Sequence, residues 1–469
     1  MHLVGLDGNS IDKAQVDHVD AHLRIDHPVQ CIADIGFGRQ VGWLIHGGSF
    51  LVAVRLVFNV TAVTALINRG MGYNPPSAIH PIPRIVPMSV KNRSLRIICA
   101  YLLIHSLPLC AAGPDAATAA FLLEMNIEED AVAVRDRPGW KPPARIVISV
   151  APDDLAARPD LLDWIREVTG EIPLVTSNAG FGQAPEESIM RDMEVYLGYC
   201  TPAIVRGAPK LRWLQHYGVG VEGCAMLPES QDGHFILTNN QHYSAPPIAE
   251  HVIAMMMMLT RGLGGSHAAQ LQEDWGRAAA SATPMIEVKD KTMLVAGLGG
   301  IGTEVARRAH GLGMHVIATR NSSREGPDFV EYVGLADELQ TLAARADVIV
   351  NALPLTRETT GLFDREFFAA LKPGSYFISV GRGRSTVTDD LVAALKDGKL
   401  AGAGLDVTDP EPLPKGHPLW QIPNVIITPH NSSTSDRAQE RRWIVIRENL
   451  RRYIAGEKML NVVDIKKGY

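Results

Sequence analysis

The stretch from Thr292 to Arg324 constrains the fold of this 469-residue chain more than any other. It holds a short apolar run, the segment Gly-Leu-Gly-Gly-Ile-Gly at 297–302, a segment with apolar residues at helical spacing, and a second apolar run at 315–318. This order predicts a strand, a glycine turn, a helix and a second strand. Such a unit is the beginning of a parallel α/β sheet that binds a dinucleotide.

The glycines of this turn have distinct physical uses. Gly297 allows a tight turn, Gly299 lets the backbone approach a pyrophosphate, and Gly302 lets the helix pack closely on the strand. The first turn of the helix adds free N–H groups and the positive end of its dipole. The alternative is a glycine-rich turn without a ligand. We therefore predict cofactor contacts at Gly297, Gly299, Gly300, Ile301 and Gly302.

The end of the second apolar run predicts which dinucleotide binds. Sites for NAD place an acid there to accept from the ribose 2′-OH, but this chain has Arg320, eighteen residues after Gly302. Arg320, Ser322 and Arg324 offer positive charge and hydrogen-bond donors to a 2′-phosphate. We expect a preference for NADP(H), with NAD(H) possible. The alternative is that these arginines belong to a solvated loop.

Composition limits the remaining classes of function. The length suggests two or three domains. A net charge of −6 does not indicate nucleic-acid binding. The five cysteines are scattered and include no Cys-x-x-Cys, so we expect neither a zinc site nor a disulfide framework. His251 stands in a predicted helix without a second ligand at i+4, and we predict no metal site.

The N-terminal part of the chain, residues 1–113, differs from the rest in its sequence pattern. Residues 1–87 contain no motif and are an extension of doubtful structure. Residues 88–113 combine a basic start, a short apolar run and small residues, as a signal peptide does. One hypothesis is that the functional start is Met88 and that the protein is exported. The other is a buried apolar helix, with the enzyme in the cytoplasm where its nucleotide pool lies.

Domain limits follow from changes in pattern. Residues 114–136 read as a helix, and the following residues up to 143 read as a turn-rich linker. A buried strand at 145–150 begins a small α/β domain, assigned to residues 144–244 and 431–469. The nucleotide-binding domain is assigned to residues 245–430. It opens with a long apolar helix at 244–262, whose prolines suit a first helical turn.

Three chemically distinctive side chains follow successive predicted strands after the glycine turn. Arg382 follows 376–380, Glu411 follows 402–407, and His430 follows 425–428. Since ligands bind at the carboxyl ends of parallel strands, all three are expected at the edge that carries the glycine turn. Further cofactor contacts are predicted at the same edge, at Leu353, Pro354, Thr356, Val380 and Gly381.

These residue types suit hydride transfer to a 2-oxo acid. Arginine binds a carboxylate through a planar fork. Histidine can give a proton to the carbonyl oxygen as hydride reaches the carbon, and a carboxylate partner fixes its tautomer. Arg382, Glu411 and His430 are therefore the predicted catalytic residues.

Residues from about 144 to 469 resemble the D-isomer-specific 2-hydroxyacid dehydrogenase family. The resemblance is carried by the glycine turn and by these segments: 214–221 (Leu-Gln-His-Tyr-Gly-Val-Gly-Val), Pro-Pro-Ile-Ala-Glu-His at 246–251, Gly-Arg-Gly at 381–383, Leu-Asp-Val at 405–407, Pro-Glu-Pro at 410–412 and Thr-Pro-His at 428–430.

The resemblance implies roles for single residues. Arg382 would bind the substrate carboxylate and carbonyl, and His430 would be the general acid/base with Glu411 as its partner. Backbone N–H groups at Val219 and Gly220 would bind the carboxylate. Asp406 resembles an aspartate near the nicotinamide.

The family's architecture also implies a fold and an assembly. We expect two Rossmann-like, doubly wound parallel-sheet domains, the coenzyme domain being inserted into the substrate domain, after an atypical N-terminal extension. A homodimer formed largely through the coenzyme domain is expected, and the partner ligand is a small 2-oxo or 2-hydroxy acid. The alternative function is a nucleotide-sensing, corepressor-like binding protein with little turnover.

Overall fold

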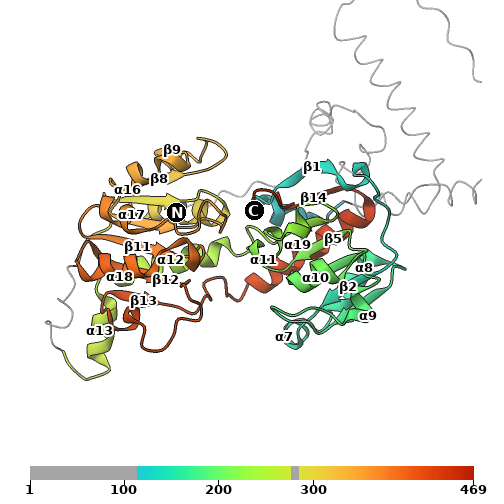
Figure 1. The fold of residues 1–469 in the computed structure, drawn as a ribbon, viewed down its shortest axis with the longest axis horizontal. Helices are drawn as coiled ribbons and strands as arrows, with labels where there is room; N and C mark the ends of the chain where they lie inside the picture. Colours follow the sequence, from blue (N-terminus) through green and yellow to red (C-terminus); the bar gives the residue numbers. More distant parts are fainter. Residues whose placement is uncertain (1–112, 276–284) are drawn as a thin grey trace, which may run out of the picture. The chain divides into compact units, whose positions relative to one another are not determined.

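The computed structural model describes residues 113–275 and 285–469, whose fold is shown in Figure 1. Their strands form a five-stranded, a seven-stranded and a two-stranded sheet. Every strand pair in the two larger sheets is parallel. The predictions for residues 1–87, and for nearly all of 88–113, lie outside the described residues.

The five-stranded sheet has the strand order β3-β2-β4-β5-β6. Short apolar runs form its strands, which are β2 (Ile146–Ser149), β3 (Leu174–Ser177), β4 (Val195–Gly198), β5 (Trp213–His216) and β6 (Ile236–Thr238). The helices between them are α7 (Pro152–Ala157), α8 (Leu161–Thr169), α9 (Glu187–Met190), α10 (Pro202–Gly207), α11 (Glu222–Ala225) and the 3-10 turn η3 (Pro228–Ser230).

Helices cover both faces of this sheet. Alternate strand residues, such as Ile146 and Ile148, pack with Leu161 of α8 and with Trp443 of α19 (Ala438–Ala455). The neighbour Val147 points the other way and packs with Ile204 of α10. This alternation follows from the period of two along a strand, and it explains why a strand covered on both faces, such as β2, is a nearly continuous apolar run.

The seven-stranded sheet has the order β13-β12-β11-β10-β7-β8-β9. Its strands are β7 (Thr292–Ala296), β8 (His315–Thr319), β9 (Tyr332–Gly334), β10 (Val348–Asn351), β11 (Ser375–Ser379), β12 (Leu400–Leu405) and β13 (Val425–Ile427). The helices are α12 (Ala245–Thr260), α13 (Leu263–Gln270), α15 (Gly300–Gly311), α16 (Leu339–Ala343), α17 (Arg365–Ala370) and α18 (Thr388–Lys396), with 3-10 turns η4 (Ala336–Glu338), η5 (Gly383–Ser385) and η6 (Pro418–Gln421).

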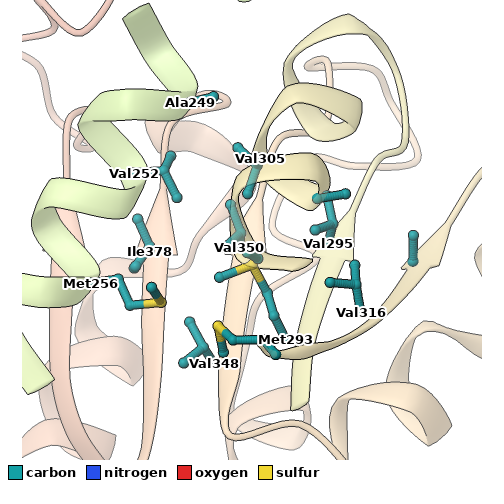
Figure 2. Close-up of a cluster of buried hydrophobic side chains, with 14 of the residues drawn as sticks. Ala249, Val252, Met256, Met293, Val295, Val305, Val316, Val348, Val350 and Ile378 are labelled. Carbon is teal, nitrogen blue, oxygen red and sulfur yellow. The ribbon is translucent and has the colours of Figure 1, made fainter. Parts of the chain in front are cut away.

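Helix α12 supplies much of the core on one face of this sheet. Figure 2 shows Ala249, Val252 and Met256 of α12 directed at side chains from the strands and from α15. Val295, Val350 and the rest of this cluster are almost fully buried. Helices α16, α17 and α18 cover the opposite face through a second cluster that contains Leu294, Ile349 and Phe377. The sheet is therefore doubly wound.

The chain crosses from one sheet to the other twice. After β13 it forms α19, whose Trp443, Leu450 and Tyr453 belong to the core of the five-stranded sheet. Tyr453 stacks on Trp213 of β5 with ring centroids 4.7 Å apart. The seven-stranded unit is thus inserted into the five-stranded one. The predicted fold class, two Rossmann-like units with one inserted in the other, is confirmed for the part of the chain that the structure describes.

The prediction of a helix across 114–136 is only partly right. The helix α6 ends early (Ala116–Glu124), and β1 (Glu129–Ala133) and the 3-10 turn η2 (Val134–Asp136) follow it. Strand β1 pairs antiparallel with β14 (Lys458–Leu460). The partner lies more than 300 residues further along the chain, so no local pattern signals this strand.

The described residues lack a membrane-spanning helix and a metal-binding cluster. None of their helices has the length and apolarity needed to span a membrane. They also contain no group of three or more His, Cys, Asp or Glu side chains placed to hold a metal ion.

Candidate active site

The glycine turn joins β7 to α15 and packs as tightly as its sequence suggests. Gly297 has a φ of +96°, a conformation that glycine adopts readily. A Cβ at Gly302 would lie 2.0 Å from the Gly297 carbonyl oxygen, whereas one at Gly299 would have no atom within 4 Å. The turn therefore needs Gly302 for packing, and open space remains at Gly299, where a pyrophosphate could approach the backbone.

Neighbouring loops converge on this turn. A Cβ at Gly297 would lie 3.1 Å from Cδ2 of Leu353, and a Cβ at Gly381 would lie 2.6 Å from the Leu353 carbonyl oxygen. Asn351 holds the loop after β10 close to the loop after β11. Its backbone carbonyl accepts from the Val380 N–H, and its side-chain oxygen accepts from the Leu353 N–H at 3.1 Å. The structure thus brings the loops after β7, β10 and β11 together.

The next predicted contacts lie in the same loops. Pro354 is exposed, while Thr356 is buried and its N–H donates to Oγ1 of Thr359 at 2.8 Å. Gly300 and Ile301, at the start of α15, are half-buried. A Cβ at Gly300 would lie 2.8 Å from Nδ1 of His242, a residue that the sequence analysis did not single out.

The three residues predicted to contact a 2′-phosphate follow β8. Arg320 donates from Nη1 to the Glu325 carbonyl at 3.3 Å, and Ser322 is exposed. Arg324 forms an exposed ion pair with Glu338 at 2.6 Å. An exposed pair of this kind contributes little free energy, so Arg324 can exchange its partner for an anionic ligand. Nearby, Nδ2 of Asn321 donates to the Tyr469 hydroxyl at 2.9 Å.

His430 and Glu411 form a pair outside β13 and β12. Nδ1 of His430 lies 2.7 Å from Oε1 of Glu411, and both side chains are about two-fifths exposed. If the carboxylate accepts from Nδ1–H, the other ring nitrogen, Nε2, is left to exchange a proton with a ligand. Sequence spacing alone had suggested only that the two would share a sheet edge.

Asp406 holds the backbone that carries His430. Its buried carboxylate accepts from the N–H groups of Asn431 and Ser432 and from the hydroxyl of Thr428. The His430 N–H donates to the Asp406 carbonyl at 2.9 Å. His430 has a φ of +52°, which is unfavourable for a residue with a Cβ. Asp406 thus offsets the strain at His430 and fixes the direction of its side chain.

His251 joins this group from α12. Its Nε2 lies 3.0 Å from Oγ1 of Thr428, which in turn donates to Asp406 at 2.6 Å. The residue therefore supports the His430 loop.

Arg382 follows β11 and reaches the loop after β5. Its Nε donates to Oε1 of Glu222 at 2.6 Å. A Cβ at Gly220 would lie only 1.6 Å from Nη2 of Arg382. The predicted carboxylate-binding residues Arg382 and Gly220 are therefore neighbours. Val219 lies beside them, and its carbonyl accepts from Nδ2 of Asn239 at 2.7 Å.

His216 supports this loop from beneath. The Cys200 N–H donates to its Nδ1 at 3.0 Å. Burial lowers the pKa of His216 to about 4, although the Glu222 carboxylate acts in the opposite direction. The imidazole is therefore neutral near pH 7 and fills a packing and hydrogen-bonding role.

The cysteine pattern suggests no disulfide framework, but the structure contains one disulfide among the described residues. Cys200, after β4, is bonded to Cys224 in α11. Strands β4 and β5 are neighbours in the sheet, so the segments that follow them lie side by side although they are 24 residues apart in sequence. An odd number of scattered cysteines gives no sign of this proximity.

Comparisons with known proteins agree with the fold. The family model described as "D-isomer specific 2-hydroxyacid dehydrogenase, NAD binding domain" matches residues 253–432. A glyoxylate reductase from Pyrococcus furiosus is 30% identical over 261 residues, which are 54% of this chain and 76% of that protein. A D-3-phosphoglycerate dehydrogenase from Methanocaldococcus jannaschii is 30% identical over 307 residues, or 64% of this chain and 57% of its own length.

A solved structure also resembles this one. The D-isomer specific 2-hydroxyacid dehydrogenase from Xanthobacter autotrophicus Py2, in complex with NADPH and MES, is 27% identical and has a TM-score of 0.57. The match covers 70% of this chain and 100% of that chain. The chain belongs to the D-isomer specific 2-hydroxyacid dehydrogenase family, although it spans only about half the length of some curated relatives, such as 57% of the phosphoglycerate dehydrogenase.

Proposed function

We propose that this protein reduces a small 2-oxo acid to the D-2-hydroxy acid with a nicotinamide cofactor, and that NADPH is preferred. The observation that carries the proposal is the pairing of His430 with Glu411 at 2.7 Å, on the edge where Arg382 and the glycine turn also lie. Family membership supports a nicotinamide cofactor and a 2-hydroxy or 2-oxo acid as the substrate class.

The residues around the glycine turn fit a dinucleotide. Open space at Gly299 and the N-terminus of the twelve-residue helix α15 suit a pyrophosphate. Arg320, Ser322 and Arg324 suit a 2′-phosphate, and the related Xanthobacter enzyme was solved with NADPH. Leu353, Pro354, Thr356, Val380, Gly381 and Asp406 would line the rest of the cofactor site.

The proposed mechanism assigns one task to each catalytic side chain. The cofactor, held by the residues around the glycine turn, would supply the hydride that the carbonyl carbon accepts. Arg382, with the backbone at Val219 and Gly220, binds the carboxylate and orients the carbonyl. His430 gives its Nε2 proton to the carbonyl oxygen, and Glu411 stabilises the protonated imidazole and holds its tautomer. In the oxidative direction His430 accepts the proton.

A substrate panel tests this proposal. Initial rates are measured with glyoxylate, hydroxypyruvate, pyruvate and larger 2-oxo acids, with NADPH and NADH in parallel. We expect turnover with at least one small acid and a higher kcat/KM for NADPH. If no acid in the panel is turned over, the proposed reaction is wrong. If kcat/KM is higher for NADH, the proposed role of Arg320 in binding a 2′-phosphate is wrong.

Two variants test the residue assignments. His430→Ala should lower kcat by about 10²–10⁴ because positioned proton transfer is lost. Arg382→Ala should raise KM strongly, since the carboxylate loses its fork of donors. Full activity in either variant would contradict the assignment, and an unchanged NADPH dissociation constant shows that the coenzyme site is intact.

The compartment is a further part of the proposal. A reductase that uses NADP(H) needs a nucleotide pool, so we propose the cytoplasm. The Cys200–Cys224 disulfide favours the alternative of an exported protein, because disulfides persist in oxidising compartments. Fractionation of native cells decides between them. We also propose that the protein forms a homodimer.

A further inference from the structure

Glu222 lies in the candidate substrate site although no motif points to it. It is the first residue of α11, directly after the predicted carboxylate-binding loop. Its Oε1 accepts from Nε of Arg382 at 2.6 Å, and both side chains are 27% exposed. A partly buried, charge-assisted hydrogen bond of this length is stronger than a solvated surface pair.

The contact fixes the Arg382 guanidinium from several sides. Nη1 donates to the Gly381 carbonyl at 2.8 Å, while Glu222 holds Nε. A Cβ at Gly220 would lie 1.6 Å from Nη2 and 2.7 Å from Oε2 of Glu222. The guanidinium therefore lies in a slot whose walls are Gly220, Gly381 and Glu222, and it is oriented before a ligand arrives.

The same contact changes the charge of the site. Burial alone would raise the pKa of Glu222, but the Arg382 guanidinium outweighs burial, and the pKa lies below its ordinary value. Glu222 is therefore ionised near pH 7 and compensates the charge of Arg382. A ligand carboxylate meets a neutral pair in place of a free cation.

The carboxylate cannot easily move away. Cys224, two residues further along α11, is bonded to Cys200 after β4. Cys200 in turn donates its N–H to His216, at the end of β5. These links fix the start of α11 to the sheet and hold Glu222 close to Arg382.

We propose that Glu222 positions Arg382 and restricts the site to 2-oxo acids that carry a single carboxylate. This inference rests on the proposed function. One ligand carboxylate binds the donors of Arg382 that Glu222 leaves free, together with the backbone of the 219–220 loop. A second ligand carboxylate adds another negative charge beside Glu222 and is repelled.

A pair of nearly isosteric ligands tests the inference without turnover. Oxamate is a monoanion and oxalate is a dianion of almost the same shape. Their dissociation constants are measured by calorimetry on the full-length protein saturated with NADPH. The proteins compared are the wild type, Glu222→Gln, which keeps an acceptor oxygen but loses the charge, and Glu222→Asp, which keeps the charge but shortens the side chain.

The expected results separate charge from position. Glu222→Gln should shift the oxalate-to-oxamate affinity ratio toward oxalate by about tenfold, the effect of one partly screened charge at short range. Glu222→Asp should keep the wild-type ratio but bind both ligands more weakly, because its carboxylate does not reach Nε. Thermal unfolding that matches the wild type shows that each variant is folded.

Opposite results overturn the inference in distinct ways. If Glu222→Gln has the wild-type oxalate-to-oxamate affinity ratio, the charge of Glu222 does not select the ligand. If Glu222→Asp binds both ligands with wild-type affinity, Glu222 does not position Arg382. If the wild type binds neither ligand, the proposed 2-oxo acid site is wrong and the inference fails with it. If the wild type binds both, the proposed site stands whatever the variants show.

Discussion

His216 is a buried residue next to the candidate site whose protonation affects the stability of the folded protein. It is 6% exposed, accepts from the Cys200 N–H and lies below the loop that meets Arg382. Its folded-state pKa of about 4 is below the value of 6.5 for a free histidine. Between these values the unfolded chain binds a proton that the folded protein excludes, so stability is complete above pH 6.5 and is lost as pH falls toward 4.

We therefore predict that acid destabilises the wild type more than His216→Asn. Between pH 7 and pH 5, the histidine should account for a loss of about 2 kcal/mol in unfolding free energy, according to the linkage relation. Urea unfolding of both proteins at the two pH values measures the difference. All other titrating groups are shared, so equal losses in the two proteins would contradict the buried, neutral state of His216.

At the same scale, the sequence predicted some site residues and missed others for physical reasons. The placement of Arg382, Glu411 and His430 was predictable because each follows an apolar run, and parallel strands bring their carboxyl ends to one edge. Glu222 was not, since a glutamate at a helix start is usually solvated. Its contact with Arg382 joins residues 160 apart in sequence. Proximity of this kind depends on packing between units, which one sequence does not specify.

At the scale of elements, the strand–turn–helix unit rests on two glycines with different tasks. At Gly302 a Cβ would lie 2.0 Å from the Gly297 carbonyl oxygen and 3.0 Å from Val295. At Gly299 the backbone is extended, with φ −91°, and the space around a Cβ is open. Alanine should therefore disrupt α15 packing at one position and block only a ligand at the other.

We predict opposite outcomes for Gly302→Ala and Gly299→Ala. The first should lose about 3 kcal/mol of stability or more, as overpacked cores do. The second should unfold like the wild type but bind NADPH at least about tenfold more weakly, because its methyl group occupies the pyrophosphate approach. Urea unfolding and fluorescence titration with NADPH measure the two effects. Normal NADPH affinity in Gly299→Ala would place the pyrophosphate elsewhere.

Elements with local signals were predictable, and those with distant partners were not. The central strands of both large sheets, such as β2 and β10, are buried on both faces and appear as short apolar runs, so the local sequence pattern predicts them. Strand β1 has the short, mostly exposed sequence Glu-Asp-Ala-Val-Ala, and its partner in the two-stranded sheet is β14. The alanines and acidic residues of β1 favour a helix when only the local sequence is considered. The partner strand lies far away in sequence and gives no local signal.

At the scale of the molecule, one face of α12 is buried and another is left apolar and exposed. Its inner face packs on the seven-stranded sheet (Figure 2). Its outer face contributes Ile253, Ala254 and Met257 to a shallow apolar hollow that Leu312, after α15, completes. Glu250 and Arg308 border the hollow and form an ion pair at 3.1 Å. An apolar centre with a charged rim is typical of an interface between subunits.

We predict that two copies of the chain associate through this hollow. Light scattering after size exclusion should give twice the mass of the chain for the wild type. Met257→Glu should give the mass of a single chain at micromolar concentration, because dimerisation would bury an unpaired carboxylate at a cost of several kcal/mol. Leu123→Glu is the matched control, since Leu123 is 83% exposed on α6. A wild-type monomer would refute the dimer, and a dimeric Met257→Glu would place the interface on another surface.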